Sequence, residues 1–224
     1  MPGADDPCPL CGKPLYGWVT LPAEGAAPVI GRAAPGAGTR VIDRCEACGV
    51  GVERGREIDL AEELRAISEP RGEGGALRIG CANRASLQAA LSAEGWAPVD
   101  RLPGRLALTP RSLALLGERN GYRLERPSFP PMSRGQGWMW QTLVNALTFH
   151  NNFARDVRAG KLRRSTTRRW MFAIDAVVTV LAAPLALLAS FPLETISALL
   201  NRGGWMEATT VPARVPAGPA GAES

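Results

Sequence analysis

The sequence predicts a mixed α+β protein whose larger part is a truncated α/β domain, and three observations lead to this prediction. Two C-x-x-C-G motifs stand within the first 50 residues and indicate a small module of their own. Between residues 76 and 130, short apolar strands alternate with helical segments, but there are too few of them for a complete α/β sheet. The uncharged run 176–193 and a strand after it predict apolar helices followed by a closing strand.

The two motifs, CPLCG from Cys8 and CEACG from Cys45, have the spacing of zinc knuckles. Two residues between the cysteines let both sulfurs face one ion. The glycine that follows can take the positive φ that turns backbone amides toward the thiolates. Four thiolates make a closed tetrahedral set without an open position, so the site is predicted to be structural. The predicted Zn²⁺ ligands are Cys8, Cys11, Cys45 and Cys48.

The alternative is that these cysteines form disulfides or a redox pair. The chain has five cysteines, so full pairing would leave one over, and no signal peptide precedes Cys8. Residues 1–55 are therefore expected to form a zinc ribbon. Its long irregular tip would be the Gly-, Ala- and Pro-rich segment 25–38, and the strand 41–44 would enter the second knuckle.

Residues 56–75 are expected to link the ribbon to the next domain. The segment 57–68 has apolar residues at a helical period, and Pro70 with the glycine-rich run 71–75 ends it.

The next segment follows the order of half a nucleotide-binding βαβ unit. A strand at 77–83 ends in a glycine turn, a helix follows at 85–93, and a second short strand, 96–100, ends in Asp100. A further helix at 111–119 and a strand at 122–126 complete this part.

Positive charge is concentrated in one block. Residues 151–170 hold seven basic side chains against one acid, a local net charge of +6, so the rest of the chain sums to −1. Because this block leads directly into the most apolar stretch, anionic membrane lipids are the expected partner. A solvated arginine-rich linker is the alternative. The ribbon is not basic, which argues against nucleic acid as a partner.

The run 176–193 contains no charged residue and, as a helix, would be about 27 Å long. Pro184 lies in its middle and Pro192 near its end, which favours a membrane hairpin or a shallow re-entrant segment over a straight span. A strand at 205–211 must pair with strands before residue 130, so residues 131–203 would leave the domain and return to the same side. The tail 213–224 is expected to be disordered.

An amphipathic helix over 137–159 precedes the basic block, and its apolar stripe fits either the protein core or a membrane interface. On the second interpretation, tryptophans and arginines around this segment would contact the membrane. The candidate membrane residues are Trp138, Trp140, Arg163, Arg164, Arg168, Arg169 and Trp170.

In this order, the pieces resemble bacterial class I S-adenosylmethionine (SAM) methyltransferases that carry an N-terminal zinc ribbon and a C-terminal membrane-associating segment. The likeness is carried by the two cysteine motifs, by LRIGCANRASLQAAL from Leu77, by LALTPRSLALLGERNGYRLER from Leu106, and by GWMWQTLVNALTFHNNFARD from Gly137 with NRGGWMEATTV from Asn201. The resemblance implies an incomplete Rossmann-like domain over residues 76–130 and 204–212. In it, the closing strand pairs antiparallel with the strand 122–126.

The resemblance also implies a SAM site, with Gly80, Ala82 and Asp100 as its contacts. In the family, an apolar strand with one acidic residue is followed by a loop that carries three glycines. Here Ala82 and Arg84 occupy the second and third glycine positions, and Arg78 replaces the acid. Arg84 would crowd SAM and repel its sulfonium, so SAM binding is expected to be weak or absent. The alternative for Asp100 is an ordinary acid in a turn.

The strands that carry the catalytic groups in that family are also missing from this chain. Only residues 101–109 separate Asp100 from the next helix, where a complete domain needs on the order of 80 residues. The lone His150 and the isolated Cys81 have no catalytic partner at a recognisable spacing.

Three functions stay open at this point. The first is a non-catalytic protein on the cytoplasmic face of the membrane, derived from a methyltransferase, with a scaffold or docking role. The second is an active SAM-dependent methyltransferase on a lipid-linked or cell-envelope substrate, completed by another protein subunit. The third is a zinc-ribbon nucleic-acid binder.

Overall fold

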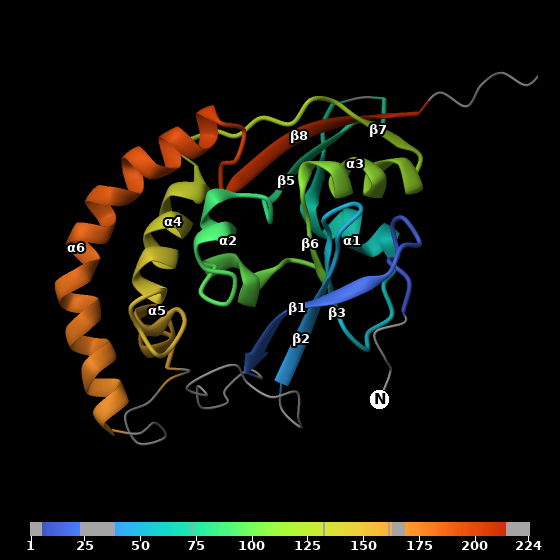
Figure 1. Cartoon of the computed structure of the whole chain (residues 1–224). Helices are drawn as coiled ribbons and strands as arrows, with labels where there is room; N and C mark the ends of the chain where they lie inside the picture. Colours follow the sequence, from blue (N-terminus) through green and yellow to red (C-terminus); the bar gives the residue numbers. More distant parts are fainter. Residues whose placement is uncertain are drawn as a thin grey trace, which may run out of the picture.

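Two small antiparallel sheets form the centre of the protein in a computed structural model, and a long helix lies along one side of them (Figure 1). The structure describes residues 6–22, 39–72, 74–131, 133–160, 162 and 169–213. The predicted loop tip 25–38 and all but the first residue of the predicted tail 213–224 lie outside these ranges.

The first sheet is built on the hairpin between the two cysteine motifs and has the order β1-β2-β3-β6. The predicted strand 41–44 lies within β2. The fourth strand, β6, comes from the segment 101–109 of the predicted Rossmann-like domain and joins the ribbon because its Ala107 pairs with Gly51 of β3. A Cβ atom on Gly51 would lie 3.0 Å from the Ala107 Cβ, so glycine permits this close approach. The strands are β1 (Leu15–Pro22), β2 (Thr39–Cys45), β3 (Gly51–Glu53) and β6 (Leu106–Ala107).

The second sheet has the order β4-β5-β8-β7, with the closing strand β8 in its interior. The predicted strands 77–83, 122–126 and 205–211 are all present, and Arg123 pairs antiparallel with Val211 as expected. On its other side, β8 pairs with β5 over six residues, from Leu77 opposite Thr210 to Ala82 opposite Trp205. The strands are β4 (Ser68–Pro70), β5 (Leu77–Ala82), β7 (Tyr122–Leu124) and β8 (Trp205–Pro212).

Every strand pair in the described residues is antiparallel, so the sheet lacks the parallel pairing on which a Rossmann-like domain is built. The predicted strand 96–100 is also wrong: these residues form the 3-10 helix η1 (Ala97–Arg101). Tertiary contacts explain the difference, because the Trp96 side chain is fully buried and the Ala97 amide donates to the Thr142 hydroxyl. Pro98 also has no amide hydrogen to give to a sheet.

Three helices before residue 120 fall where the sequence placed them. They are α1 (Leu60–Ile67), α2 (Leu87–Leu91) and α3 (Pro110–Arg119). Side chains before each helix accept from its first amides: Asp59 caps α1, Ser86 caps α2, and Thr109 forms a capping box on α3.

The predicted helix 137–159 is instead two helices, α4 (Arg134–Asn145) and α5 (Phe153–Arg158). The break is fixed by Asn145, whose carboxamide oxygen accepts from the Asn152 amide and whose NH₂ group donates to the Gly95 carbonyl. Asn152 has a positive φ of 57°, a conformation that a continuing helix cannot contain.

The predicted hairpin within 176–193 is wrong, because α6 (Arg169–Leu199) is one continuous helix of 31 residues. Pro184 and Pro192 lie within this helix and are exposed, and the helix is bowed, with its convex side away from the domain (Figure 1). A proline bends a helix away from its ring without reversing the chain. The predicted return to the domain is nevertheless made, since α6 runs back beside α4 and leads into β8.

One apolar core joins the ribbon to the second sheet across the predicted linker 56–75. Leu10 and Val50 from the cysteine motifs belong to the same buried cluster as Ile79, Leu113 and Met206. The ribbon is therefore packed into the rest of the protein.

Candidate metal centre

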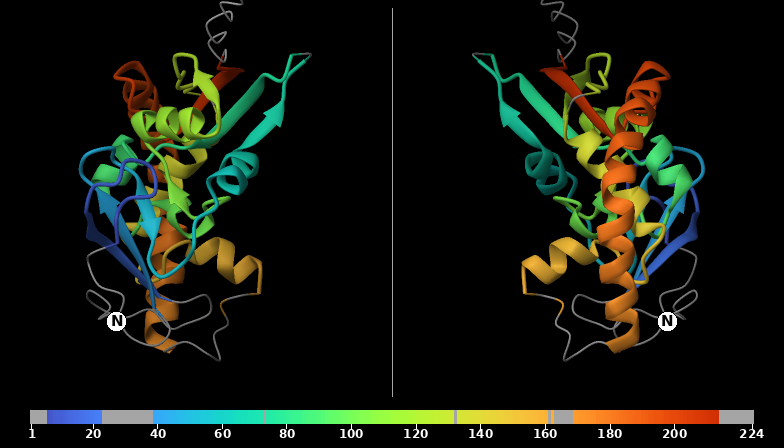
Figure 2. Two further views of the ribbon diagram at one scale, coloured as in Figure 1. Left: turned by 90° about the vertical axis from the view of Figure 1, so that its right-hand side faces the viewer. Right: turned by 90° about the vertical axis from the view of Figure 1, so that its left-hand side faces the viewer.

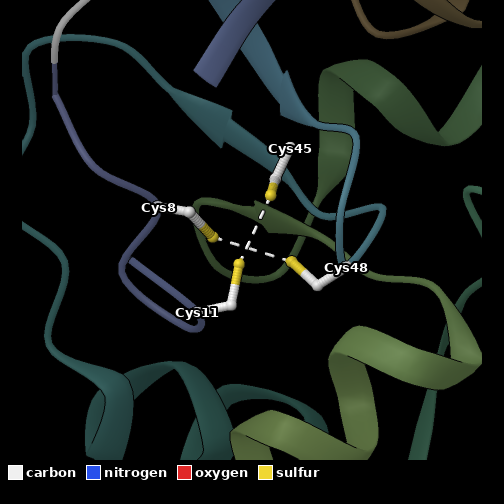
Figure 3. A group of neighbouring side chains, drawn as sticks. All are labelled: Cys8, Cys11, Cys45 and Cys48. Atoms are coloured by element: carbon white, nitrogen blue, oxygen red, sulfur yellow. Dashed lines mark hydrogen bonds between the residues drawn. The ribbon is translucent and has the colours of Figure 1, made fainter. Parts of the chain in front are cut away.

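The four cysteines of the two motifs converge on one point, as Figure 3 shows. The Cys8 and Cys48 sulfurs are 3.6 Å apart, the Cys11 and Cys45 sulfurs 3.4 Å, and all four lie within 4.8 Å of one another. A zinc ion with Zn–S bonds of about 2.3 Å in a tetrahedron requires sulfurs about 3.8 Å apart. The set therefore fits a tetrathiolate metal site, and a disulfide, with sulfurs about 2 Å apart, does not describe it.

Both motifs fold in the same way around their sulfurs. Gly12 and Gly49 have positive φ angles of 71° and 79°, as predicted, and their amides donate to the Cys8 and Cys45 carbonyls, each at 2.8 Å. This turn points further backbone amides at the thiols, which is how zinc knuckles share the charge of the thiolates.

The thiol pKa values follow from burial and these amides. Burial raises the pKa of Cys8 and of Cys48, while the neighbouring amides partly offset the effect. At Cys45, burial also raises the pKa, but the Cys48 amide and the Cys11 side chain outweigh it, so the pKa falls below its ordinary value. Cys8 and Cys48, whose pKa values are raised, become thiolates readily only when a cation joins them.

Side chains from the second part of the chain bind the carbonyls of both knuckles. The Thr109 hydroxyl donates to the Cys48 carbonyl at 3.0 Å, and Arg119 donates to the Leu10 carbonyl at 3.2 Å. Arg84 donates to the Gly49 carbonyl at 2.7 Å and lies over the Trp18 ring at 4.2 Å. The metal centre is thus held by the protein around it, as outer-shell partners commonly hold metal ligands.

Four cysteine ligands leave no coordination position for water or substrate, so the chemistry available to the ion is structural. Cys81, the fifth cysteine, lies in β5 and is only 3% exposed, and this burial raises its pKa to about 12. It is therefore a poor nucleophile and takes no part in the metal set.

Two of the three predicted SAM contacts line a pocket of about 510 Å³. Gly80 and Ala82 lie on its sheet face, with Trp138 and Trp205 beside them. A Cβ atom on Gly80 would meet the Trp205 ring at 2.5 Å, so the glycine is required by an internal aromatic contact. The third predicted contact, Asp100, lies in η1, where the structure describes only its backbone.

The two arginines of the predicted cofactor loop also have partners within the protein. Arg84 donates to the Gly49 carbonyl and does not belong to the lining of the pocket at Gly80. Arg78 forms an ion pair with Glu207 at 3.0 Å across β5 and β8, which lowers the pKa of Glu207.

The predicted membrane residues divide into three groups. Trp138 and Trp140 face inward: Trp138 packs edge-on against Trp205, and the Trp140 indole donates to the Ala183 carbonyl of α6. Arg169 and Trp170 are exposed at the start of α6, where Trp170 contacts Phe149. The predictions for Arg163, Arg164 and Arg168 lie outside the described residues.

The feature that the sequence analysis missed is the orientation of α6, which has its polar side chains inside and its apolar ones outside. The buried positions include Asp175, Ser190, Glu194 and Ser197, each at most 1% exposed. Ser190, Glu194 and Ser197 are four and three residues apart, and Asp175 lies about four helical turns before Ser190, so this spacing in the sequence could have revealed the inner stripe. The exposed apolar side chains of the helix are Trp170, Ile174, Val177, Val180, Leu181, Leu185, Leu187, Leu188, Phe191, Ile196 and Leu199.

The outer face of α6 is uncovered, as the right-hand view of Figure 2 shows. By length and composition α6 could cross a membrane, and only 17% of its most apolar window is buried inside the protein.

No protein-family model, curated protein or solved structure matches this chain.

Proposed function

We propose that this is a membrane-surface zinc-ribbon protein without catalytic activity, which uses the outer face of α6 to attach to anionic lipids on the cytoplasmic face of the membrane. The observation that carries the proposal is the reversed polarity of α6. A helix of a water-soluble protein places its apolar stripe toward the core and its charges outward, and α6 does the opposite.

The free energy available at this face is large enough for stable attachment. Leu181, Leu185 and Leu188 are each about 70% exposed. Burying a whole leucine side chain contributes about 1.5–3 kcal/mol, so each of these would gain about 1–2 kcal/mol in lipid. Five such residues would supply about 5–10 kcal/mol, and salt does not weaken this contribution.

Charge near the first turn of α6 favours an anionic surface. Arg158 and Arg169, both from the basic block 151–170, are exposed, and Trp170 follows Arg169 directly and contacts Phe149. Each basic side chain near an anionic leaflet adds about 1 kcal/mol, and aromatic rings prefer the level of the head groups.

The proposed absence of catalysis is supported by the groups that could have performed it. The metal site is closed, Cys81 is buried, and the buried His150 is tied through Nδ1 to Asp175 at 2.5 Å. The zinc ribbon then serves as a structural or docking module. Descent from a SAM methyltransferase is supported by the order of the strand β5 and the helix α2 at residues 77–91 and by the antiparallel closing strand, although Gly80 lies within β5 and not in the predicted glycine turn after it.

Sedimentation with lipid vesicles tests the attachment. The zinc-loaded protein should bind vesicles that contain phosphatidylserine more tightly than neutral ones, stay bound in high salt and be released by detergent. Replacing Leu181 and Leu188 by Ala should weaken binding by about tenfold per residue, because each change removes about 1–1.5 kcal/mol of apolar transfer.

The matched control is Leu91→Ala, which removes the same groups from a leucine 55% exposed on α2 and should leave binding unchanged. If the protein does not sediment with phosphatidylserine vesicles at low salt, the proposal is contradicted. Calorimetry with SAM separates the remaining alternative, since a working methyltransferase requires micromolar binding, whereas we expect none.

A further inference from the structure

We infer that α6 lies flat along the membrane surface, with its outer face in one leaflet, and does not cross the bilayer. This inference rests on the proposed attachment to lipid. It concerns the direction of the helix, which attachment alone leaves open, because α6 is long and apolar enough to span.

The first argument is that only one side of the helix is apolar and free. The inner side carries Asp175 and Glu194, both buried against the domain. A helix that crosses the hydrocarbon alone presents all of its sides to lipid, whereas a helix in the interface presents one. The exposed apolar side chains of α6 extend from Trp170 to Leu199, over nearly its whole length.

The second argument is that polar bonds fasten the inner side to the domain from one end to the other. Near the start, both Asp175 oxygens accept from the amides of Phe149 and His150. At the end, Glu194 accepts from the Gln88 carboxamide and from the Gly204 amide, each at 2.7 Å.

Further bonds lie between these two ends. Gln136 donates to the Ser190 hydroxyl at 3.0 Å, and the Trp140 indole donates to the Ala183 carbonyl at 3.0 Å. Because the domain lies beside the helix over this whole length, a crossing helix would draw the charged domain into the bilayer or break every one of these bonds.

The third argument is charge. Exposed arginines lie near both ends of α6: Arg158 and Arg169 come at or before its start, and Arg202 follows its end, where the Arg202 amide donates to the Ser197 carbonyl at 2.7 Å. In the flat orientation these arginines reach the head groups of the same leaflet that receives the leucines. A second copy of this chain would instead bring two such arginine groups to one interface, where they would repel each other, so a bilayer suits the face better.

The experiment places a small fluorescent amino acid at Val177 or at Leu199, two exposed positions about 33 Å apart along the helix. The zinc-loaded protein is added to sealed phosphatidylserine vesicles whose outer leaflet alone contains a lipid with a quencher on its head group. In the flat orientation both probes lie in the outer leaflet, so both should be quenched to a similar extent. A probe at Leu91 serves as the control and should be quenched much less.

Quenching at one end only, with the other end protected, would show that the helix crosses the bilayer and would overturn the inference while leaving the attachment intact. If the protein does not sediment with the vesicles, the proposed function itself fails. A dimer in solution whose Val177 and Leu199 probes are shielded without lipid would identify a second copy as the true occupant and would also overturn the inference.

Discussion

Replacing Arg84 by Met should lower the affinity for zinc by about tenfold. The substitution keeps an apolar stem about as long as the methylene part of the arginine but removes the guanidinium, and with it the bond to the Gly49 carbonyl and the contact with Trp18. The first interaction, from a charged donor, is worth about 1.5–3 kcal/mol. The second is worth about 0.5–2 kcal/mol.

These gains are opposed by the cost of burying the charge. Burial, with a smaller contribution from Arg44, lowers the pKa of Arg84 to about 10. At about 1.36 kcal/mol per pKa unit, the surroundings disfavour the guanidinium by roughly 3 kcal/mol, which offsets most of the gain when no metal is bound. A zinc ion with four thiolates carries a net charge of −2, which favours a nearby cation. The loss should therefore appear mainly in zinc affinity, at the lower end of the 10–100-fold range for outer-shell partners.

Competition with a chromophoric chelator measures the zinc dissociation constant of each variant. Arg44→Met is the matched control, because Arg44 is exposed, precedes Cys45 directly and directs its guanidinium to Glu46 at 3.2 Å. It should change the affinity by less than about threefold. If Arg84→Met binds zinc as tightly as the natural protein, or if the two variants weaken binding equally, the reasoning about the Gly49 bond is refuted.

Three more predictions test the metal set, the glycine at the pocket and a buried carboxylate. Cys45→Ser should release the zinc and destabilise both sheets, whereas Cys81→Ser should keep one zinc per chain by metal analysis; loss of zinc from the second variant would contradict the ligand set. Gly80→Ala should lower the free energy of unfolding in urea by about 1–3 kcal/mol, and by less in a Trp205→Ala background; an equal cost in both backgrounds would rule out the ring contact as the cause. Burial raises the pKa of Glu194, although its bonds to Gln88 and Gly204 partly oppose this. The natural protein should therefore lose stability relative to Glu194→Gln as the pH rises above about 4.5 and through the folded-state pKa. If its free energy of unfolding relative to that of Glu194→Gln does not change with pH, or increases as the pH rises, the prediction is wrong.

The convergence of the four cysteines could be predicted because it depends on local spacing. Cys8 and Cys45 each begin a five-residue unit whose fold depends on two intervening residues and one glycine. The strands β2, β5, β7 and β8 and the capped helices α1, α2 and α3 could be predicted for the same reason, since their signals lie within the elements themselves.

What could not be predicted depends on contacts between distant segments. The short strands β3 and β6 depend on the pairing of Gly51 with Ala107. The 3-10 helix η1 depends on the bond from the Ala97 amide to the Thr142 hydroxyl. The hairpin prediction failed because Pro184 and Pro192 were expected to reverse the chain. In a helix whose inner side is hydrogen-bonded to the domain, an exposed proline only bends the helix. The role of Gly80 was hidden because its reason, the Trp205 ring, lies 125 residues further along the chain.

The position of β8 in the interior of its sheet has a consequence for the order in which the protein folds. Its partner β5 precedes it by more than 120 residues, and α6 lies between them in the sequence. Until β8 arrives, β5 and β7 have no bond to each other, and Glu194 lacks its Gly204 partner. The apolar helix is therefore synthesised before the surface that holds it is complete, and the late pairing of β5 with β8 should limit the folding rate, as long-range strand pairing does in general. During that interval, binding of α6 to a membrane would shield its leucines from other unfolded chains.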